Sequence, residues 1–293
     1  MIKDLGFELV SFLSLKEVEN DIKDKYLKWL EKGYHAEMNY MENNIEVRFN
    51  IKNLLKEYNS MIVLGLNYYQ DKREGFGKNI SVYAYGRDYH KTIKGKLKKI
   101  IAFLKRNGIK ARGFTDSAPI LEKYLAQKAG LGWQGKNSLI INRKLGSYFF
   151  LAEILTDFDF KEKPKIVTEH CGKCRRCMDA CPTGAIVEDK IIDSNKCISY
   201  LTIEYKGDLE KEMALKMQDL IFGCDICQEV CPWNGKIIQT KELDFKYRYT
   251  GIDLSDLKFL KEEEFKEFFK GSPIKRAGFK HFKRQIERVL NKD

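Results

Sequence analysis

The stretch Cys171-Gly172-Lys173-Cys174-Arg175-Arg176-Cys177-Met178-Asp179-Ala180-Cys181-Pro182 decides the fold of the region around it. Three cysteines spaced three residues apart, followed by a cysteine–proline pair, form the C-x2-C-x2-C-x3-C-P run of bacterial ferredoxins. In that run the first three cysteines bind one [4Fe–4S] cluster and the fourth binds the other. The sequence therefore predicts a ferredoxin-like domain that holds two clusters and transfers electrons.

A second and shorter cysteine run completes the set. It reads Cys224-x2-Cys227-x3-Cys231-Pro232, and Cys197 lies upstream in place of a missing first cysteine. All eight cysteines of the chain lie between Cys171 and Cys231, and two [4Fe–4S] clusters need eight thiolates. The spacing assigns the first cluster to Cys171, Cys174, Cys177 and Cys231, and the second to Cys181, Cys197, Cys224 and Cys227.

Two other uses of cysteine fit this pattern less well. Structural zinc sites usually show two C-x2-C pairs, whereas here three consecutive ligands precede a C-P pair. Disulfides suit secreted chains, but the N-terminus opens no targeting segment. The sequence also lacks a run of 18 apolar residues, so we expect no membrane span. These features predict a cytoplasmic protein with reduced, cluster-bound cysteines.

At 293 residues the chain is too long for a ferredoxin alone. Residues 1–165 are numerous enough for an α/β domain with its own core, and the charged segment 161–170 predicts a linker. We expect a cluster domain at 166–236 and a basic helical tail at 237–293. Apolar patterning predicts helices at 16–32, 90–107 and 119–129 and strands at 60–69, 109–114, 138–141 and 147–156.

The chain carries a formal net charge of +11, from 53 Lys and Arg against 42 Asp and Glu. Such a surplus favours a polyanionic partner, with nucleic acid the first candidate. A lysine-rich proteome from an AT-rich genome explains the same surplus, and charge alone leaves both explanations open. Basic residues crowd 91–112 and recur at 270–292, where they alternate with aromatic residues in the manner of an RNA-binding surface.

Two features outside the cysteine runs invite a chemical interpretation. The glycine-rich segment 130–137 contains no G-K-[ST], so it is not a P-loop, and it either makes a turn or lets the backbone approach a large flat ligand. Asp116 lies between a predicted strand and a predicted helix, where an aspartate most often caps the helix. A buried aspartate with a raised pKa can instead donate a proton. The spacing alone favours the cap.

Several stretches together resemble one family, the epoxyqueuosine reductases, over roughly residues 1–290. The likeness rests on Tyr85-Gly86-Arg87-Asp88-Tyr89-His90, Asp116-Ser117-Ala118-Pro119-Ile120-Leu121-Glu122, Ala129-Gly130-Leu131-Gly132-Trp133, Gly135-Lys136-Asn137, Cys197-Ile198-Ser199-Tyr200-Leu201-Thr202 and Gly223-Cys224-Asp225 with Cys231-Pro232-Trp233-Asn234. This cobalamin-dependent iron–sulfur family catalyses the last step of queuosine synthesis at the wobble position of certain transfer RNAs. The resemblance also implies kinship with corrinoid reductive dehalogenases.

The resemblance implies an α+β protein: an N-terminal α/β cobalamin-binding catalytic domain, a ferredoxin-like domain with two [4Fe–4S] clusters, and a short helical C-terminal tail. It makes Asp116 the proton donor instead of a cap, with a pKa that burial beside the corrin should raise. The implied cobalamin contacts are Arg48, Asp116, Ile140, Leu151, Ser199, Asp225 and Ile226. The implied RNA contacts are Lys206, Lys275 and Arg276.

Many members of this family continue into a helical-repeat domain, whereas this chain ends after one more basic helix at 275–292. We expect that helix either to grip the RNA alone or to be the solvated face of a terminal helix. We also expect a monomer that receives electrons from a flavodoxin or ferredoxin. Two alternative functions are a corrinoid reductase of a small molecule, similar to a dehalogenase, and an electron-transfer protein without its own substrate.

Overall fold

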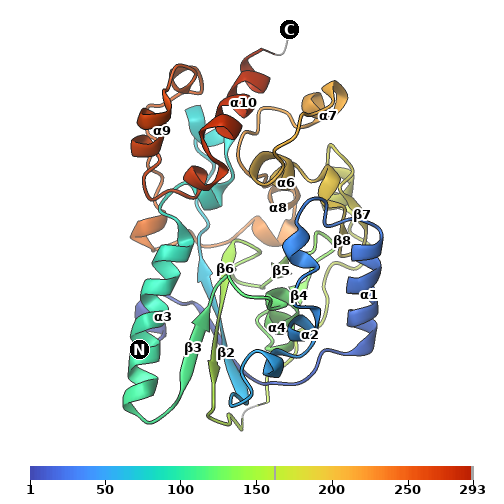
Figure 1. Ribbon diagram of the computed structural model, residues 1–293, viewed down its shortest axis with the longest axis vertical. Coiled ribbons are helices and arrows are strands. Elements are labelled where there is room, and N and C mark those ends of the chain that lie inside the picture. The colour runs from blue at the N-terminus through green and yellow to red at the C-terminus, as the bar shows by residue number, and fades with distance from the viewer. Residues whose placement is uncertain (162, 292–293) are drawn as a thin grey trace.

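The computed structural model describes residues 1–161 and 163–291. Residue 162 of the predicted linker and residues 292–293 of the predicted tail lie outside the described residues. The protein is built around a four-stranded sheet in the order β1-β2-β6-β3, and helices flank both of its faces (Figure 1). The strands span β1 (Leu9–Ser14), β2 (Ser60–Asn67), β3 (Ala111–Phe114) and β6 (Phe149–Thr156). The α+β class predicted from the sequence is confirmed.

The central strand β2 is buried along its whole length, and its side chains alternate between two apolar layers. Ile62 and Leu64 face the first layer, which contains the apolar face of α3 (Tyr89–Arg106). Met61 and Val63 face the second layer, which contains α4 (Glu122–Lys128). The period of two along a strand thus buries both faces of the sheet.

Every pairing in this sheet is antiparallel. The N-terminal part was predicted as α/β, a class whose sheets are mostly parallel, and the strand directions correct that expectation. β1 was not predicted at all, because its residues alternate less clearly and all six are only half-buried. The predicted strands at 60–69, 109–114, 138–141 and 147–156 and the three predicted helices are confirmed with shifted ends.

The remaining elements are short and lie mostly around the cluster region and the C-terminus. The other helices are α1 (Asn20–Glu31), α2 (Ile45–Phe49), α5 (Arg176–Asp179), α6 (Ile198–Ile203), α7 (Lys211–Lys216), α8 (Ile226–Glu229), α9 (Glu262–Phe268) and α10 (Phe279–Leu290). Two hairpins are formed by β4 (Trp133–Gln134) with β5 (Ile140–Ile141) and by β7 (Ile186–Glu188) with β8 (Ile191–Ile192). The 3-10 helices are η1 (Lys3–Leu5), η2 (Asn39–Met41), η3 (Ile51–Asn53), η4 (Gly75–Asn79), η5 (Val82–Ala84), η6 (Ser194–Lys196), η7 (Pro232–Asn234), η8 (Leu243–Phe245), η9 (Ser255–Leu257) and η10 (Pro273–Ala277).

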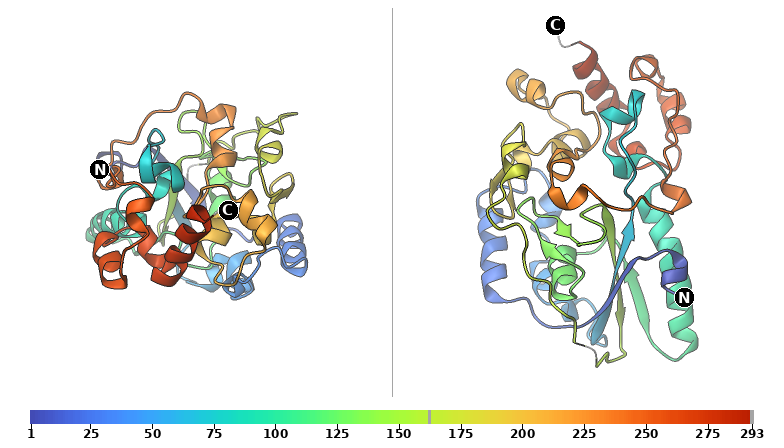
Figure 2. Two further views of the ribbon diagram at one scale, coloured as in Figure 1. Left: turned by 90° about the horizontal axis from the view of Figure 1, so that it is seen from above. Right: turned by 180° about the vertical axis from the view of Figure 1, so that it is seen from behind.

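The C-terminal segment shares a core with the N-terminal segment. Phe265, Phe269 and Phe282 are almost fully buried and belong to the same apolar layer as β2 and α3. Figure 2 shows α9 and α10 gathered at the end of the molecule where η5 also lies. The tail predicted at 237–293 therefore packs as part of the main body, and its apolar face has a defined partner.

Candidate active site

Asp116 lies in the loop between β3 and α4, at the end of the central sheet. Its backbone adopts a φ of +47°, which side-chain-bearing residues rarely do. Its N–H donates to Oε1 of Glu122 at 2.7 Å. Helix α4 begins only at Glu122, with Leu121 as its N-cap residue, so Asp116 does not cap it. The conformation leaves the Asp116 side chain free to face a different set of groups.

The Asp116 carboxylate contacts the first turn of α3 through its Oδ2 atom. The Tyr89 hydroxyl donates to Oδ2, and the His90 Nε2 atom lies 3.5 Å from it. Burial acts to raise the pKa of Asp116, but hydrogen bonds from His90 and Tyr89 outweigh burial and lower it. This direction is opposite to the raised pKa expected from the sequence. The reason is that two donors stabilise the ionised form.

His90 connects Asp116 to a second carboxylate. Its Nδ1 atom lies 2.9 Å from Oδ1 of Asp88, which also caps α3 by accepting the His90 N–H at 3.0 Å. Burial acts to lower the pKa of His90, but Asp116 and Asp88 outweigh burial and raise it. The three groups form a carboxylate–imidazole–carboxylate chain that stabilises an imidazolium.

Water reaches these groups although protein surrounds them. The Asp116 side chain is 62% exposed, and Lys123 is also exposed. Yet burial is the main influence on the pKa of Lys123 and lowers it, while the Asp116 carboxylate and the thiols of Cys197 and Cys227 act on the same ammonium. The Lys123 ammonium is therefore close enough to interact both with Asp116 and with two of the cysteines predicted to hold the second cluster.

The first group of cysteines consists of residues that act on one another electrostatically. Burial raises the pKa of the Cys177 thiol, and the Cys231 and Cys171 thiols raise it further. Burial also raises the pKa of Cys231, on which Cys171 and Cys174 act. Backbone N–H groups of Trp233 and Asn234 point at the Cys231 sulfur. These four cysteines are the ones assigned to the first cluster from spacing.

The cysteines of the second group also act on one another, and two of them, Cys197 and Cys227, interact with Lys123. Burial raises the pKa of Cys224 to about 12, and Asp225, Cys197 and Cys181 add to the effect. Burial raises the pKa of the Cys227 thiol well above its ordinary value, and the Cys224 and Cys197 thiols raise it further. The Ala185 N–H donates to the Cys181 sulfur at 3.3 Å. Thiols that raise one another's pKa, with N–H donors directed at sulfur, are a donor set suited to iron–sulfur clusters.

Residues predicted to contact cobalamin divide into two sets. Ile140 and Leu151 belong to the apolar layer under α4, and the carbonyl of Leu151 accepts the Thr115 hydroxyl at 2.9 Å, next to Asp116. Ser199 and Ile226 follow Cys197 and Cys224 and direct backbone N–H groups at those sulfurs. Leu151 is thus beside the residue that precedes Asp116, while Ser199 and Ile226 are beside sulfurs of the second cysteine group.

Arg48 and Asp225 are buried and are already used by the fold. The Arg48 guanidinium donates to the carbonyls of Tyr40 at 2.7 Å and Asn43 at 3.2 Å. Asp225 accepts the Ser81 hydroxyl and the Val82 N–H. Both side chains therefore hold loops in place. Either side chain could contact a cofactor only by giving up some of these hydrogen bonds.

The three residues predicted to bind RNA have different surroundings. Lys275 and Arg276 are exposed in η10, and Arg276 Nη1 lies 3.1 Å from His90 Nδ1. The Lys206 ammonium instead donates hydrogen bonds to the carbonyls of Ile203 and Ala277, at 2.8 and 3.1 Å. Lys206 is thus part of the packing that fixes η10 beside the site, while Arg276 extends the site to the surface.

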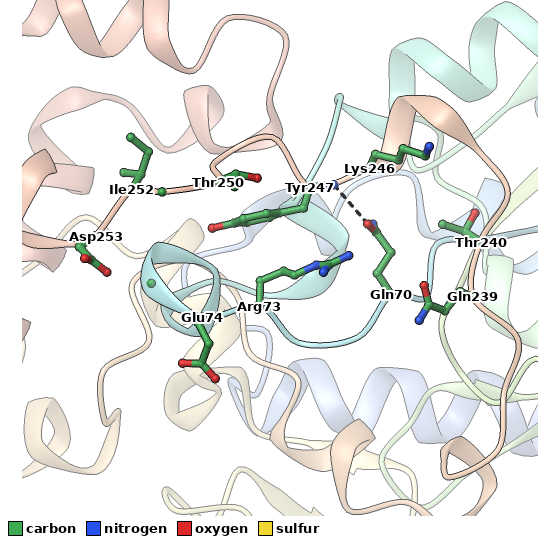
Figure 3. Close-up of a pocket in the computed structure, with 12 residues that line it drawn as sticks. Gln70, Arg73, Glu74, Gln239, Thr240, Lys246, Tyr247, Thr250, Ile252 and Asp253 are labelled. Carbon is green, nitrogen blue, oxygen red and sulfur yellow. Dashed lines mark hydrogen bonds between the residues drawn. The ribbon is translucent and has the colours of Figure 1, made fainter.

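The cavity of about 640 Å³ in Figure 3 is separate from these groups. Gln70, Arg73 and Tyr247 are among its lining residues, and none of the eight cysteines or the Asp116 neighbours is. The Tyr247 N–H donates to Oε1 of Gln70 at 3.2 Å across one wall. This opening is polar and shallow in character, and it takes no part in the arrangement described above.

The structure also resolves the glycine-rich segment and reveals residues that sequence patterning missed. A Cβ on Gly132 would lie 2.1 Å from the Ile141 carbonyl oxygen, so the glycines permit the close β4–β5 hairpin. Glu122, Lys123 and Glu153 interact electrostatically with Asp116, but nothing in their spacing predicts a role. Glu153 was detectable only as one acidic residue within the apolar run 149–155.

Comparison with known proteins gives concordant results. Residues 48–117 match the family model described as epoxyqueuosine reductase QueG (DUF1730), and residues 170–234 match that of a 4Fe-4S double cluster binding domain. The chain is 41% identical over 292 residues to the epoxyqueuosine reductase of Cyclobacterium marinum, covering 98% of this chain and 94% of that protein.

Two solved structures superpose on almost the whole chain. One is an epoxyqueuosine reductase with an epoxyqueuosine-modified transfer RNA(Tyr) stem loop, at a TM-score of 0.90 and 28% identity, covering 99% of this chain and 79% of that one. The other is the Bacillus subtilis epoxyqueuosine reductase with its aspartate catalytic loop swung out of the active site, also at a TM-score of 0.90, 28% identity and the same coverage. Within the described residues, no helix is long and apolar enough to cross a membrane.

Proposed function

This chain belongs to the epoxyqueuosine reductase family, and we propose that it reduces epoxyqueuosine to queuosine at the wobble position of a transfer RNA, with cobalamin reduced through two [4Fe–4S] clusters. The observation that carries the proposal is that the Lys123 ammonium interacts both with the Asp116 carboxylate and with the thiols of Cys197 and Cys227. The reaction removes the epoxide oxygen as water, which consumes two electrons and two protons. A proton donor near cysteines that can hold a cluster suits that requirement.

Asp116 is the proposed proton donor to the epoxide oxygen. In the cofactor-free chain its pKa is lowered, so the carboxylate is ionised near neutral pH. A cofactor and a nucleotide bound beside Asp116 would displace water from its carboxyl group. Desolvation raises the pKa of a carboxyl group. The imidazolium favoured at His90 adjoins the same Oδ2 atom and is a source of the proton. The Tyr89 hydroxyl fixes the orientation of the acid.

Four residues are the proposed lining of a cobalamin site. Ile140 and Leu151 would offer apolar surface to the corrin ring, and Ser199 and Ile226 lie beside sulfurs of the second cysteine group. When bound, cobalamin would supply a low-valent metal centre that delivers electrons to the epoxide carbon. Arg48 and Asp225 are retained as proposed contacts, through loops that their side chains hold.

The two cysteine groups define an order for electron transfer. Cys227 of the second group is also acted on by Cys177 of the first, so the groups adjoin each other. We assign Cys181, Cys197, Cys224 and Cys227 to the cluster next to cobalamin. Cys171, Cys174, Cys177 and Cys231 then hold the cluster that accepts electrons from a flavodoxin or ferredoxin. The proposed substrate and the reduced cysteines make the cytoplasm the expected compartment.

Lys275 and Arg276 are the proposed RNA contacts, because they are exposed and lead directly to His90. Lys206 supports them by anchoring η10. Anaerobic turnover of transfer RNA that carries epoxyqueuosine, with and without cobalamin, tests the whole proposal. Conversion to queuosine that requires cobalamin supports it. A cluster- and cobalamin-loaded protein that leaves the RNA unchanged contradicts it and favours a corrinoid reductase of a small molecule.

A further inference from the structure

We propose that Glu122 is a positioning residue that holds the Asp116 loop in the active site, and that Glu153 beneath it keeps Glu122 in place. The proposal rests on the proposed function, since Asp116 is the acid being positioned. Glu122 itself does not face the substrate. It acts through the Asp116 backbone N–H, which donates to Glu122 Oε1 at 2.7 Å.

Asp116 needs such a support because of its backbone conformation. A φ of +47° is rare in a residue with a side chain and persists only where neighbouring contacts hold it. Ser117 is exposed and gives the loop little apolar contact of its own. Glu122, in contrast, begins a helix that packs against β2 and β6. The hydrogen bond therefore ties a strained loop to a fixed element.

Glu153 explains why Glu122 stays oriented toward the loop. It is fully buried on β6, opposite Val63 of β2 and Phe114 of β3, on the face that packs against α4. Within the described chain, neither of its carboxyl oxygens has a partner in hydrogen-bonding geometry, although the Glu122 carboxyl is close enough to interact. A buried carboxyl without a cation is neutral, so it has a proton to offer to a neighbouring carboxylate.

Few titratable groups influence the pKa values of Glu122 and Glu153. Asp116, in the loop, acts electrostatically on both carboxyls, and Lys123, on α4, acts on Glu122. Burial and then Asp116 raise the pKa of Glu122 to about 7, whereas the Asp116 N–H and Glu153 act to lower it. A carboxyl group keeps an oxygen lone pair in either protonation state, so Glu122 can accept the Asp116 N–H in both.

A related enzyme shows that such a loop has a second position. In the Bacillus subtilis structure the aspartate catalytic loop is swung out of the active site. In this chain Asp116 contacts Tyr89, and the Glu122 hydrogen bond is present. A loop that moves away from α4 has to give up this hydrogen bond, so the bond favours the position described here.

Replacing Glu122 by Ala and by Gln in the cluster- and cobalamin-loaded enzyme tests the inference. Glu122→Ala removes the acceptor, so we expect about tenfold faster amide hydrogen exchange at residues 116–118 and a kcat lowered about tenfold or more, with KM for the RNA nearly unchanged. Glu122→Gln keeps a carbonyl acceptor and should restore most of both. Lys128→Ala is the matched control and should change neither, because Lys128 lies in the last turn of the same helix and pairs with Glu19 instead of the Asp116 loop.

The outcomes separate this inference from the proposed function. Unchanged exchange and unchanged kcat in Glu122→Ala would overturn the positioning role while leaving the reaction intact. Equal losses in Glu122→Ala and Glu122→Gln would also overturn it, because the lost feature would then be the charge. If the wild-type enzyme does not convert the RNA at all, the proposed function fails, and the exchange comparison still reports whether Glu122 holds the loop.

Discussion

The Nη1 atom of Arg276 lies 3.1 Å from the Nδ1 atom of His90, whose Nε2 atom lies 3.5 Å from the Asp116 carboxylate. An exposed residue of the basic C-terminal segment is thereby joined to the proposed proton donor through a single imidazole. The two residues are 160 positions apart, as the numbers 116 and 276 show. The proposed RNA contact and the proposed proton donor consequently lie beside the same imidazole.

Replacing Asp116 by Asn should lower kcat by about 10²–10⁴-fold, because the amide cannot donate an acidic proton. The amide is isosteric and can still accept from the Tyr89 hydroxyl, so the loop should keep its place. Single-turnover assays measure the rate, while absorbance spectra check that iron and cobalamin are retained. Turnover within about twofold of wild type would exclude Asp116 as the acid.

Lys275→Ala should weaken binding of the RNA stem loop and reduce the slope of log affinity against log salt by about 0.7, the loss of one phosphate contact. Arg276→Ala should do the same, because its guanidinium is exposed beside His90. Lys28→Ala in α1 is a control of equal charge and should leave the salt slope unchanged. Identical slopes in all four proteins would place the RNA elsewhere on the surface.

Replacing one cysteine from each group should remove different clusters. Cys174→Ala should lose the first cluster and leave about half of the iron, with the second cluster still detectable by electron paramagnetic resonance. Cys224→Ala should lose the second cluster and abolish reduction of bound cobalamin. Met178→Leu, within α5, is the control and should retain both. Loss of the same signal in both cysteine variants would contradict the division into two groups.

His281 should make the stability of the protein depend on pH. Its Nε2 atom contacts the Thr202 carbonyl at 2.7 Å, its Nδ1 atom faces Arg284, and burial lowers its pKa to about 4 from 6.5. The folded state therefore favours the neutral ring, so this contribution is complete above pH 6.5 and is lost as the pH falls toward 4. The loss is on the order of 2 kcal/mol after allowing for partial solvation.

Thermal unfolding of the cluster-loaded protein between pH 4 and 7 measures the effect of His281. The variant His281→Gln keeps an amide donor for Thr202 and should show a flatter dependence of Tm on pH than wild type. An equally steep dependence in both proteins would assign the acid sensitivity to other groups, such as carboxylates that are ionised in the fold.

The sequence predicted the features that depend on spacing along the chain. Both cysteine groups follow from intervals of three and four residues, and β2 and α3 follow from unbroken apolar periodicity. The pairing of β1 with β2 is long-range, and its half-buried residues carry no clear alternation. The antiparallel direction of the sheet was likewise invisible, since strand direction is set by connections through the whole fold.

The electrostatics of the site could not be predicted because they arise from residues distant in sequence. Tyr89 and His90 reach Asp116 from another element and reverse the expected direction of its pKa shift. Glu153 meets Glu122 only because β6 lies beneath α4. Nothing in the sequence shows that the Lys206 ammonium is engaged, yet it donates hydrogen bonds to two backbone carbonyls.

The central claim is that cobalamin, reduced through the two clusters, deoxygenates the base while Asp116 supplies the proton. The most direct measurement is anaerobic turnover of epoxyqueuosine-containing transfer RNA by the cluster-loaded protein with a low-potential reductant, with and without cobalamin, read by mass spectrometry of the nucleosides. We predict loss of one oxygen atom from the modified nucleoside only when cobalamin is present. Equal conversion without cobalamin, or no conversion by protein that holds both clusters and cobalamin, would contradict the claim.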